Sequence, residues 1–143
     1  MPLTRSEVRL RRQARARTLQ ALYAWEAAGA PSLGDAAMRL WDDLALPAEV
    51  RAVAGPMLRA VEANRPAIDE AIAAAADNWR MERIGAIERA VLRLATAELM
   101  KGEVPPLVAI QEALHLTERF ASPGSARFVN GVLDTIARRL GRL

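Results

Sequence analysis

The residues best suited to chemistry lie near the start of the chain, where residues 9–26 read RLRRQARARTLQALYAWE. Six arginines against one glutamate give residues 5–17 a charge of +5, whereas the whole chain carries +3. Arginine suits phosphate because its planar guanidinium donates two parallel hydrogen bonds and sheds its hydration readily. Such concentrated charge attracts a polyanion. The segment favours a nucleic-acid ligand, and a merely solvated helix face is the alternative.

Helical periodicity divides this segment into two faces. At about 100° per residue, one stripe suits a bundle core, and it comprises Leu10, Ala14, Thr18, Ala21, Leu22 and Trp25. The opposite face carries Arg5, Arg9, Arg12, Ala16, Gln20 and Tyr23, with Arg11 and Arg15 on a flank. Cationic groups beside planar ones are typical of single-stranded RNA binding. A membrane-surface helix is disfavoured, because the large apolar residues are needed for the core.

Groups that catalyse reactions or hold metals are scarce elsewhere. His115 is the one histidine and there is no cysteine, so neither a nucleophile–histidine pair nor a metal site is expected. Asp42 and Asp43 are adjacent on a helix and would diverge. The glycines form no phosphate-binding loop. Glu98 falls on an apolar helix face, where a carboxylate needs a partner, and we expect an arginine there. The sequence predicts no enzyme and no cofactor.

Composition limits the class of protein and its compartment. The 143 residues contain 4% aromatics and no cysteine, which favours a single domain in a reducing compartment. Neither a signal peptide nor an apolar run of about 20 residues is evident. A soluble cytoplasmic protein is expected. The whole chain prefers arginine to lysine, since Lys101 is the only lysine among 20 basic residues. This general preference weakens the inference from arginine to a phosphate ligand.

Alanine-rich helical periodicity without alternating β-branched runs predicts an all-α fold of six or seven helices. We expect a first helix that starts around Thr4 or Ser6, either of which could cap it, and runs to the break at residues 29–31. Further helices are expected over 33–44, 47–78, 79–100, 107–120 and 125–140. Pro56 or Pro66 should kink the third, the fourth should lie near the centre, and Ser125 should cap the last. A midpoint near residue 76 predicts two packed sub-bundles, 1–76 and 77–143, within one domain of residues 1–143.

Three blocks of residues in this sequence form one pattern. The first comprises Arg11, Arg12, Ala14, Arg15, Gln20, Ala21, Leu22, Tyr23 and Trp25. The second comprises Trp79, Glu82, Arg83, Ile84, Ile87, Glu88, Arg89, Ala90, Leu92, Arg93, Ala95, Glu98 and Leu99. The third joins Pro105, Val108, Ala109, Ile110, Glu112, Ala113, Leu116 and Phe120 to RFVNGVLD, residues 127–134. In this order and spacing, and over most of the chain, the three blocks together resemble the NusB family of bacterial transcription antitermination factors.

The resemblance implies two small helical bundles and a role in transcription antitermination. It implies binding of single-stranded boxA RNA, usually with the ribosomal protein NusE, in a complex that joins RNA polymerase on ribosomal RNA operons. The implied RNA contacts are Arg11, Arg12 and Arg15, with a second region at Ser125, Arg127 and Phe128. Arg9 and Gln20 are also candidate RNA contacts, because they fall on the polar face of the first helix. The implied partner-binding residues are Tyr23, Glu82 and Glu88.

Several alternatives stay open at this level. Gln111 and Gly124 depart from the family pattern, which weakens the second RNA region. Asn130 and Gly131 suit close helix packing better than a ligand. Other readings are a protein-binding helical adaptor, a module serving an RNA methyltransferase, and a homodimer that buries the arginine helix. Because Arg12 and Arg15 lie off the core stripe, reversing both charges should abolish RNA binding without unfolding the protein.

Overall fold

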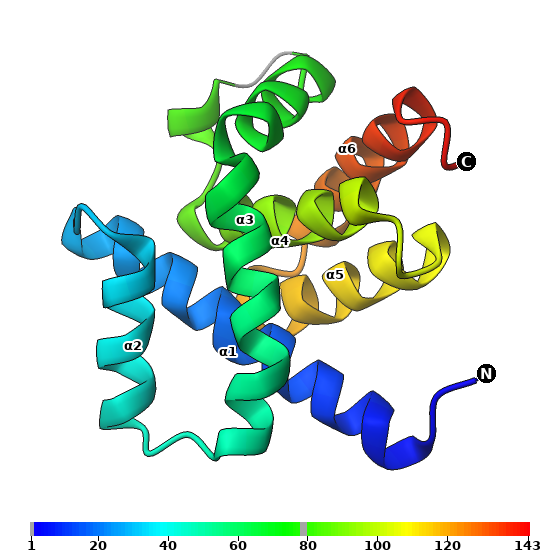
Figure 1. The fold of residues 1–143 in the computed structure, drawn as a ribbon. Helices are drawn as coiled ribbons and strands as arrows, with labels where there is room; N and C mark the ends of the chain where they lie inside the picture. The colour runs from blue at the N-terminus through cyan, green and yellow to red at the C-terminus, as the bar shows by residue number, and fades with distance from the viewer. Residues whose placement is uncertain (1, 78–79) are drawn as a thin grey trace.

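The computed structural model describes residues 2–77 and 80–143, and in that part of the chain the only regular structure is helical. The elements in order are α1 (Arg5–Ala28), α2 (Leu33–Asp43), α3 (Ala48–Ala75), the 3-10 helix η1 (Met81–Arg83), α4 (Ala86–Lys101), α5 (Pro106–Phe120) and α6 (Ser125–Arg139). Figure 1 shows α1 running diagonally from the N-terminus and crossing α3. The all-α prediction is confirmed.

Local signals set both ends of α1. Thr4 caps the first turn, with its Oγ1 accepting a hydrogen bond from the Glu7 amide at 3.1 Å and the Glu7 carboxylate accepting one from the Thr4 amide. This reciprocal pair satisfies two amides that a helix start leaves unpaired. Gly29 ends the helix at φ 62°, a left-handed conformation that glycine adopts without strain. The predicted cap at Thr4 and the predicted end at Gly29 are confirmed.

One of the two prolines in α3 coincides with a kink. Asn64 leaves the helical region with φ −119° and ψ 15°, two residues before Pro66. Pro66 cannot donate to the preceding turn, and its ring crowds that turn. Pro56 lies within the helix without such a departure. The prediction of a kink at one of these prolines is confirmed.

The segment before α4 differs from the expected helix. Met81–Arg83 form a 3-10 turn, Ile84 is extended yet only 4% exposed, and α4 begins at Ala86. The Arg89 guanidinium donates to the carbonyls of Met81 and Ile84, so a side chain satisfies groups that a continuous helix would have paired internally. Trp79 and the expected helix start at 79 lie outside the described residues.

The expected cap of α6 is also wrong. Gly124 occupies the N-cap position and makes no side-chain cap, and Ser125 is the first helical residue. The Ser125 hydroxyl donates to Glu88 at 2.7 Å instead. The last helix is therefore tied to α4 by a side-chain contact at its first residue.

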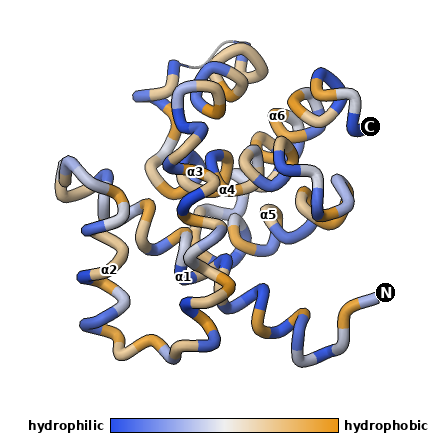
Figure 2. Tube along the Cα trace, in the orientation of Figure 1, coloured by the Kyte–Doolittle hydropathy of each residue, from blue (hydrophilic) through white to orange (hydrophobic). Residues whose placement is uncertain are grey.

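The core is centred on α4. All residues from 90 to 97 are buried, and α4 packs against α1, α3, α5 and α6. Hydrophobic segments of the trace lie mainly where the helices face one another (Figure 2). The prediction of a central fourth helix is confirmed, whereas the division into sub-bundles at residue 76 stays a prediction. None of the helices in the described residues combines the length and apolarity needed to cross a bilayer.

A glycine exchange tests the end of α4. Gly102 has φ +76°, and a Cβ there would lie 2.5 Å from Arg142 Nη1. We expect Gly102→Ala to lower the free energy of unfolding by roughly 1–2 kcal/mol, the cost of a left-handed non-glycine residue. Gly131→Ala is the matched control, because this helical glycine has open space around it and should gain about 0.5–1 kcal/mol. Urea unfolding measures both free energies. Equal changes in the two variants would contradict the left-handed conformation at Gly102.

Candidate nucleic-acid interface

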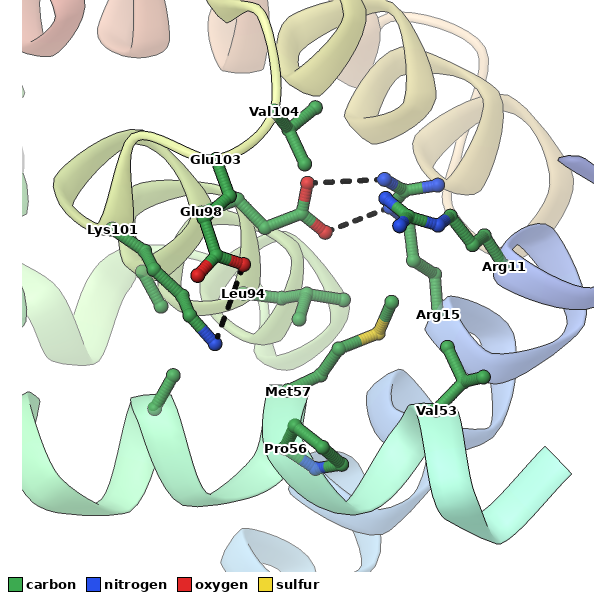
Figure 3. A pocket seen from close by; sticks show the side chains of 12 residues that line it. Arg11, Arg15, Val53, Pro56, Met57, Leu94, Glu98, Lys101, Glu103 and Val104 are labelled. Atoms are coloured by element: carbon green, nitrogen blue, oxygen red, sulfur yellow. Dashed lines mark hydrogen bonds and ion pairs between the residues drawn. The ribbon is translucent and has the colours of Figure 1, made fainter. Parts of the chain in front are cut away.

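The first two turns of α1 carry cations without partners. Arg9 is exposed and Arg11 is partly exposed, and neither makes a hydrogen bond or ion pair with any residue that the structure describes. Arg11 lies at the edge of a cavity of about 150 Å³ between α1, α3 and α4 (Figure 3). These guanidinium groups keep their full donor capacity for a ligand.

Arg12 is held by one nitrogen only. Its Nε donates to both carboxylate oxygens of Glu112 on α5, at 3.0 and 3.1 Å. The Arg12 side chain is 54% exposed, whereas that of Glu112 is 11% exposed. The contact joins α1 to α5 and leaves the outer part of the guanidinium in solvent.

Arg15 is buried, and its expected place off the core is wrong. The residue is 5% exposed, and its Nε and Nη2 donate to the two oxygens of Glu98 at 2.7 and 3.2 Å. Figure 3 shows this ion pair on the wall of the cavity that Arg11 also lines. The expected arginine partner of Glu98 is therefore confirmed. The contact uses both an inner and an outer nitrogen of Arg15, which disfavours a direct role in RNA binding.

The far face of α1 is more covered than the periodicity predicts. Ala16 is 5% exposed although it falls on the polar side. Gln20 is partly buried and accepts a hydrogen bond from Arg17 Nη1 at 3.0 Å. The predicted core stripe itself is buried or partly buried throughout. The arginine face is thus confined to the N-terminal part of the helix.

The second predicted RNA region surrounds the start of α6. Arg127 is exposed, Phe128 packs partly against the core, and Ser125 is 9% exposed. A cavity of about 260 Å³ is lined there by Glu88, Gly124, Ser125 and Phe128, among others. Since Ser125 bonds to Glu88, a predicted RNA residue contacts a predicted partner residue.

The other predicted partner residues lie where α1, η1 and α4 meet. Tyr23 and Glu82 are both exposed. Arg89 joins their segments by pairing with Glu26 on α1 and donating to the Met81 carbonyl. These contacts leave the Tyr23 ring and the Glu82 carboxylate at the surface, where a protein could reach them.

Sequence reasoning missed a partly buried ionic network near this surface. Glu26 pairs with Arg89 and, at 2.7 Å, with Arg93, which also pairs with Asp69 at 2.9 Å. Burial first, and the neighbouring charge of Arg93 second, lower the pKa of Arg89 from its ordinary value. Arg93 also lies 5.6 Å from the Trp25 ring centre. The network fixes α1 against α3 and α4.

The potential metal ligands do not cluster within residues 2–77 and 80–143. His115 is exposed, and this part of the chain holds no cluster of three or more potential metal ligands. Asp42 accepts a hydrogen bond from Arg51 at 2.7 Å near the end of α2.

Comparison with known proteins identifies the family. The NusB family profile matches residues 12–138. The transcription antitermination protein NusB of Anaeromyxobacter dehalogenans strain 2CP-1 is 44% identical over 131 residues, covering 91% of this chain and 92% of that protein. T. maritima NusB superposes with a TM-score of 0.82 at 31% identity, covering 90% of each chain.

A second solved structure adds the context of a complex. A chain from the crystal structure of antitermination factors NusB and NusE in complex with dsRNA superposes with a TM-score of 0.82 at 25% identity. The match covers 92% of this chain and 98% of that one. The helices that carry the exposed arginines are thus part of a shared architecture, and this chain belongs to the NusB family.

Proposed function

We propose that this protein binds boxA RNA together with NusE and thereby acts as a non-enzymatic antitermination factor for RNA polymerase on ribosomal RNA operons. Membership of the NusB family and the likeness to a NusB–NusE–RNA complex support this function. The observation that carries the RNA part is the exposed cationic end of α1, where Arg9 and Arg11 have no partner in the described chain and Arg12 keeps its outer nitrogens free.

The proposed RNA surface runs over α1 and continues at the start of α6. Arg9, Arg11 and Arg12 supply cations from α1, and Arg127 supplies an exposed cation from α6. Arg15 is buried beneath this surface, and its ion pair with Glu98 fixes α1 to α4. Ser125 likewise holds the start of α6 against Glu88, so these two residues shape the surface and do not contact RNA.

The proposed NusE surface comprises Tyr23, Glu82 and Glu88. Tyr23 and Glu82 offer exposed groups on neighbouring segments, and Glu88 borders the cavity beside Ser125. We assign Tyr23 to the protein partner and not to base stacking, because it lies beyond the cationic part of α1. The adaptor and methyltransferase alternatives are not favoured, since the relatives are antitermination proteins. Self-association stays a prediction.

Salt dependence tests the proposed RNA contacts. If Arg9, Arg11, Arg12 and Arg127 neutralise about four phosphates of single-stranded RNA, log affinity should fall with log salt at a slope of about −2.8. The affinity then drops roughly fifty-fold between about 50 and 200 mM salt. Fluorescence anisotropy with boxA RNA in the presence of NusE, alongside NusE alone, measures this slope for the complex. If the salt slope of the complex equals that of NusE alone, a phosphate-binding role for this chain is contradicted.

A further inference from the structure

A groove between α1 and α5 adjoins the proposed RNA surface but includes residues outside it. Its cavity of about 400 Å³ has walls that include Arg12, Glu112, His115, Leu116, Glu118 and Arg119. His115, Glu118 and Arg119 are exposed. Three arginines therefore line this space, namely Arg12 and Arg15 from α1 and Arg119 from α5. Arg12 and Arg119 are the exposed ones.

The contact with Glu112 orients Arg12 toward a ligand. Both bonds to the Glu112 carboxylate come from Nε, and Nη1 and Nη2 bond to nothing in the described residues. Because the guanidinium is planar, fixing Nε at a buried carboxylate also fixes the direction of the two outer nitrogens. Arg15 differs, since its contact with Glu98 also uses Nη2 and is buried.

Arg119 supplies a second cation that is also held in place. Its guanidinium carbon lies 4.7 Å from the centre of the Phe120 ring, a cation–π distance. Phe120 is partly buried against the core, so the ring gives the guanidinium a fixed support. Arg119 is in the last turn of α5, and α6 with Arg127 begins at Ser125. Arg119 is thus close in sequence to the second proposed RNA region.

We propose that this groove binds a phosphodiester group of the RNA, with Arg12 and Arg119 as its cations and Glu112 as the positioning residue of Arg12. The inference rests on the proposed RNA-binding function. Phosphate accepts paired hydrogen bonds from an arginine whose outer nitrogens are free. Glu112 holds that arginine through its inner nitrogen, so one guanidinium serves the carboxylate and the phosphate together.

The opposite interpretation is that Glu112 competes with RNA for Arg12. Its carboxylate is buried and takes its hydrogen bonds from Arg12 alone among the described residues. Releasing Arg12 would leave that carboxylate buried without a partner, which is costly. The positioning role therefore predicts that removing the Glu112 charge weakens RNA binding, whereas competition predicts that it strengthens binding.

Two glutamine variants separate these interpretations. Glu112→Gln and Glu118→Gln each remove one negative charge from the same groove, but Glu118 makes no hydrogen bond with an arginine in the described chain. In the complex with NusE, Glu112→Gln should weaken boxA RNA binding about ten-fold, the size of one charged hydrogen bond. Glu118→Gln should tighten it about two-fold by relieving repulsion. Binding of Glu112→Gln equal to or tighter than that of the unaltered protein would overturn the inference.

A background lacking Arg12 tests whether Glu112 acts through it. In Arg12→Ala, adding Glu112→Gln should change RNA affinity less than two-fold, because there is no guanidinium left to position. A further ten-fold loss in that background would show a merely structural role and overturn the inference. Arg12→Lys provides a test that does not depend on the stability of the Glu112 variant. Lysine keeps the charge but lacks the paired donors of the guanidinium, so this variant should also bind RNA about ten-fold less tightly. Unchanged RNA binding would contradict the proposal.

Arg119 tests the other side of the groove. Arg119→Ala should weaken RNA binding about five-fold or more, as expected for a phosphate contact. Arg139→Ala, an exposed arginine at the other end of α6, should change it less than two-fold. Equal effects would contradict a specific role for Arg119. If the unaltered protein with NusE shows no RNA binding beyond that of NusE alone, the proposed function itself fails and takes this inference with it.

Discussion

Replacing Arg15 by glutamate is expected to lower the free energy of unfolding by about 3–5 kcal/mol, the usual cost of removing one partner of a buried ion pair. Arg15 is 5% exposed and pairs with Glu98 through two hydrogen bonds. The variant would place two carboxylates against each other under α1. Since a domain of this size has a stability of roughly 5–15 kcal/mol, a large fraction of the total would be lost. Urea unfolding followed by circular dichroism measures the change.

Two controls isolate the buried pair. Arg9→Glu reverses an exposed charge on the same helix and should change the free energy of unfolding by less than about 0.5 kcal/mol. Arg15→Met with Glu98→Leu replaces both partners by apolar groups and should recover most of the stability, as such exchanges often do. An Arg15→Glu protein as stable as the unaltered one would contradict the buried ion pair.

Replacing Arg9 and Arg11 together by glutamine is expected to weaken boxA RNA binding about 100-fold in the presence of NusE. Each arginine loses a charged hydrogen bond to phosphate, and two such losses correspond to about two factors of ten. Neither residue has a partner in the part of the chain that the structure describes, so unfolding by urea should be nearly unchanged. Anisotropy titration measures the affinity.

The matched control for this pair is Arg59→Gln with Arg139→Gln. Both arginines are exposed and lie on α3 and α6, outside the proposed RNA surface. The control has the same net charge as the test variant, so any general effect of charge on RNA affinity appears in both. Equal weakening by the two variants would mean that the field of the whole protein, and not the α1 surface, binds the RNA.

The signals that predicted α1 correctly are local. Thr4, one of two candidate caps, marks the helix start, and Gly29 marks its end. The stripe from Leu10 to Trp25 follows from helical periodicity alone. Likewise, Pro56 and Pro66 predicted a kink at one of the two positions, because a proline affects the turn that precedes it. Each of these predictions needed only a few neighbouring residues.

Arg15 and Ala16 show where local periodicity fails. A single stripe predicts one buried face, but α1 packs against α2, α3 and α4, which cover more of its circumference. The sequence indicated that Glu98 needs an arginine but could not identify Arg15, because the two are 83 positions apart. The Arg12–Glu112 contact spans 100 positions. Contacts of this kind depend on how the helices pack, which one sequence does not specify.

The central claim is that the exposed arginines of α1 serve the recognition of boxA RNA with NusE. Its most direct test is a titration of fluorescent boxA RNA and a scrambled RNA of equal length, with and without NusE, at low and moderate salt. We expect tighter binding of boxA and a preference that increases when NusE is added. Equal binding of both RNAs with NusE present, or no binding of either, would contradict the account.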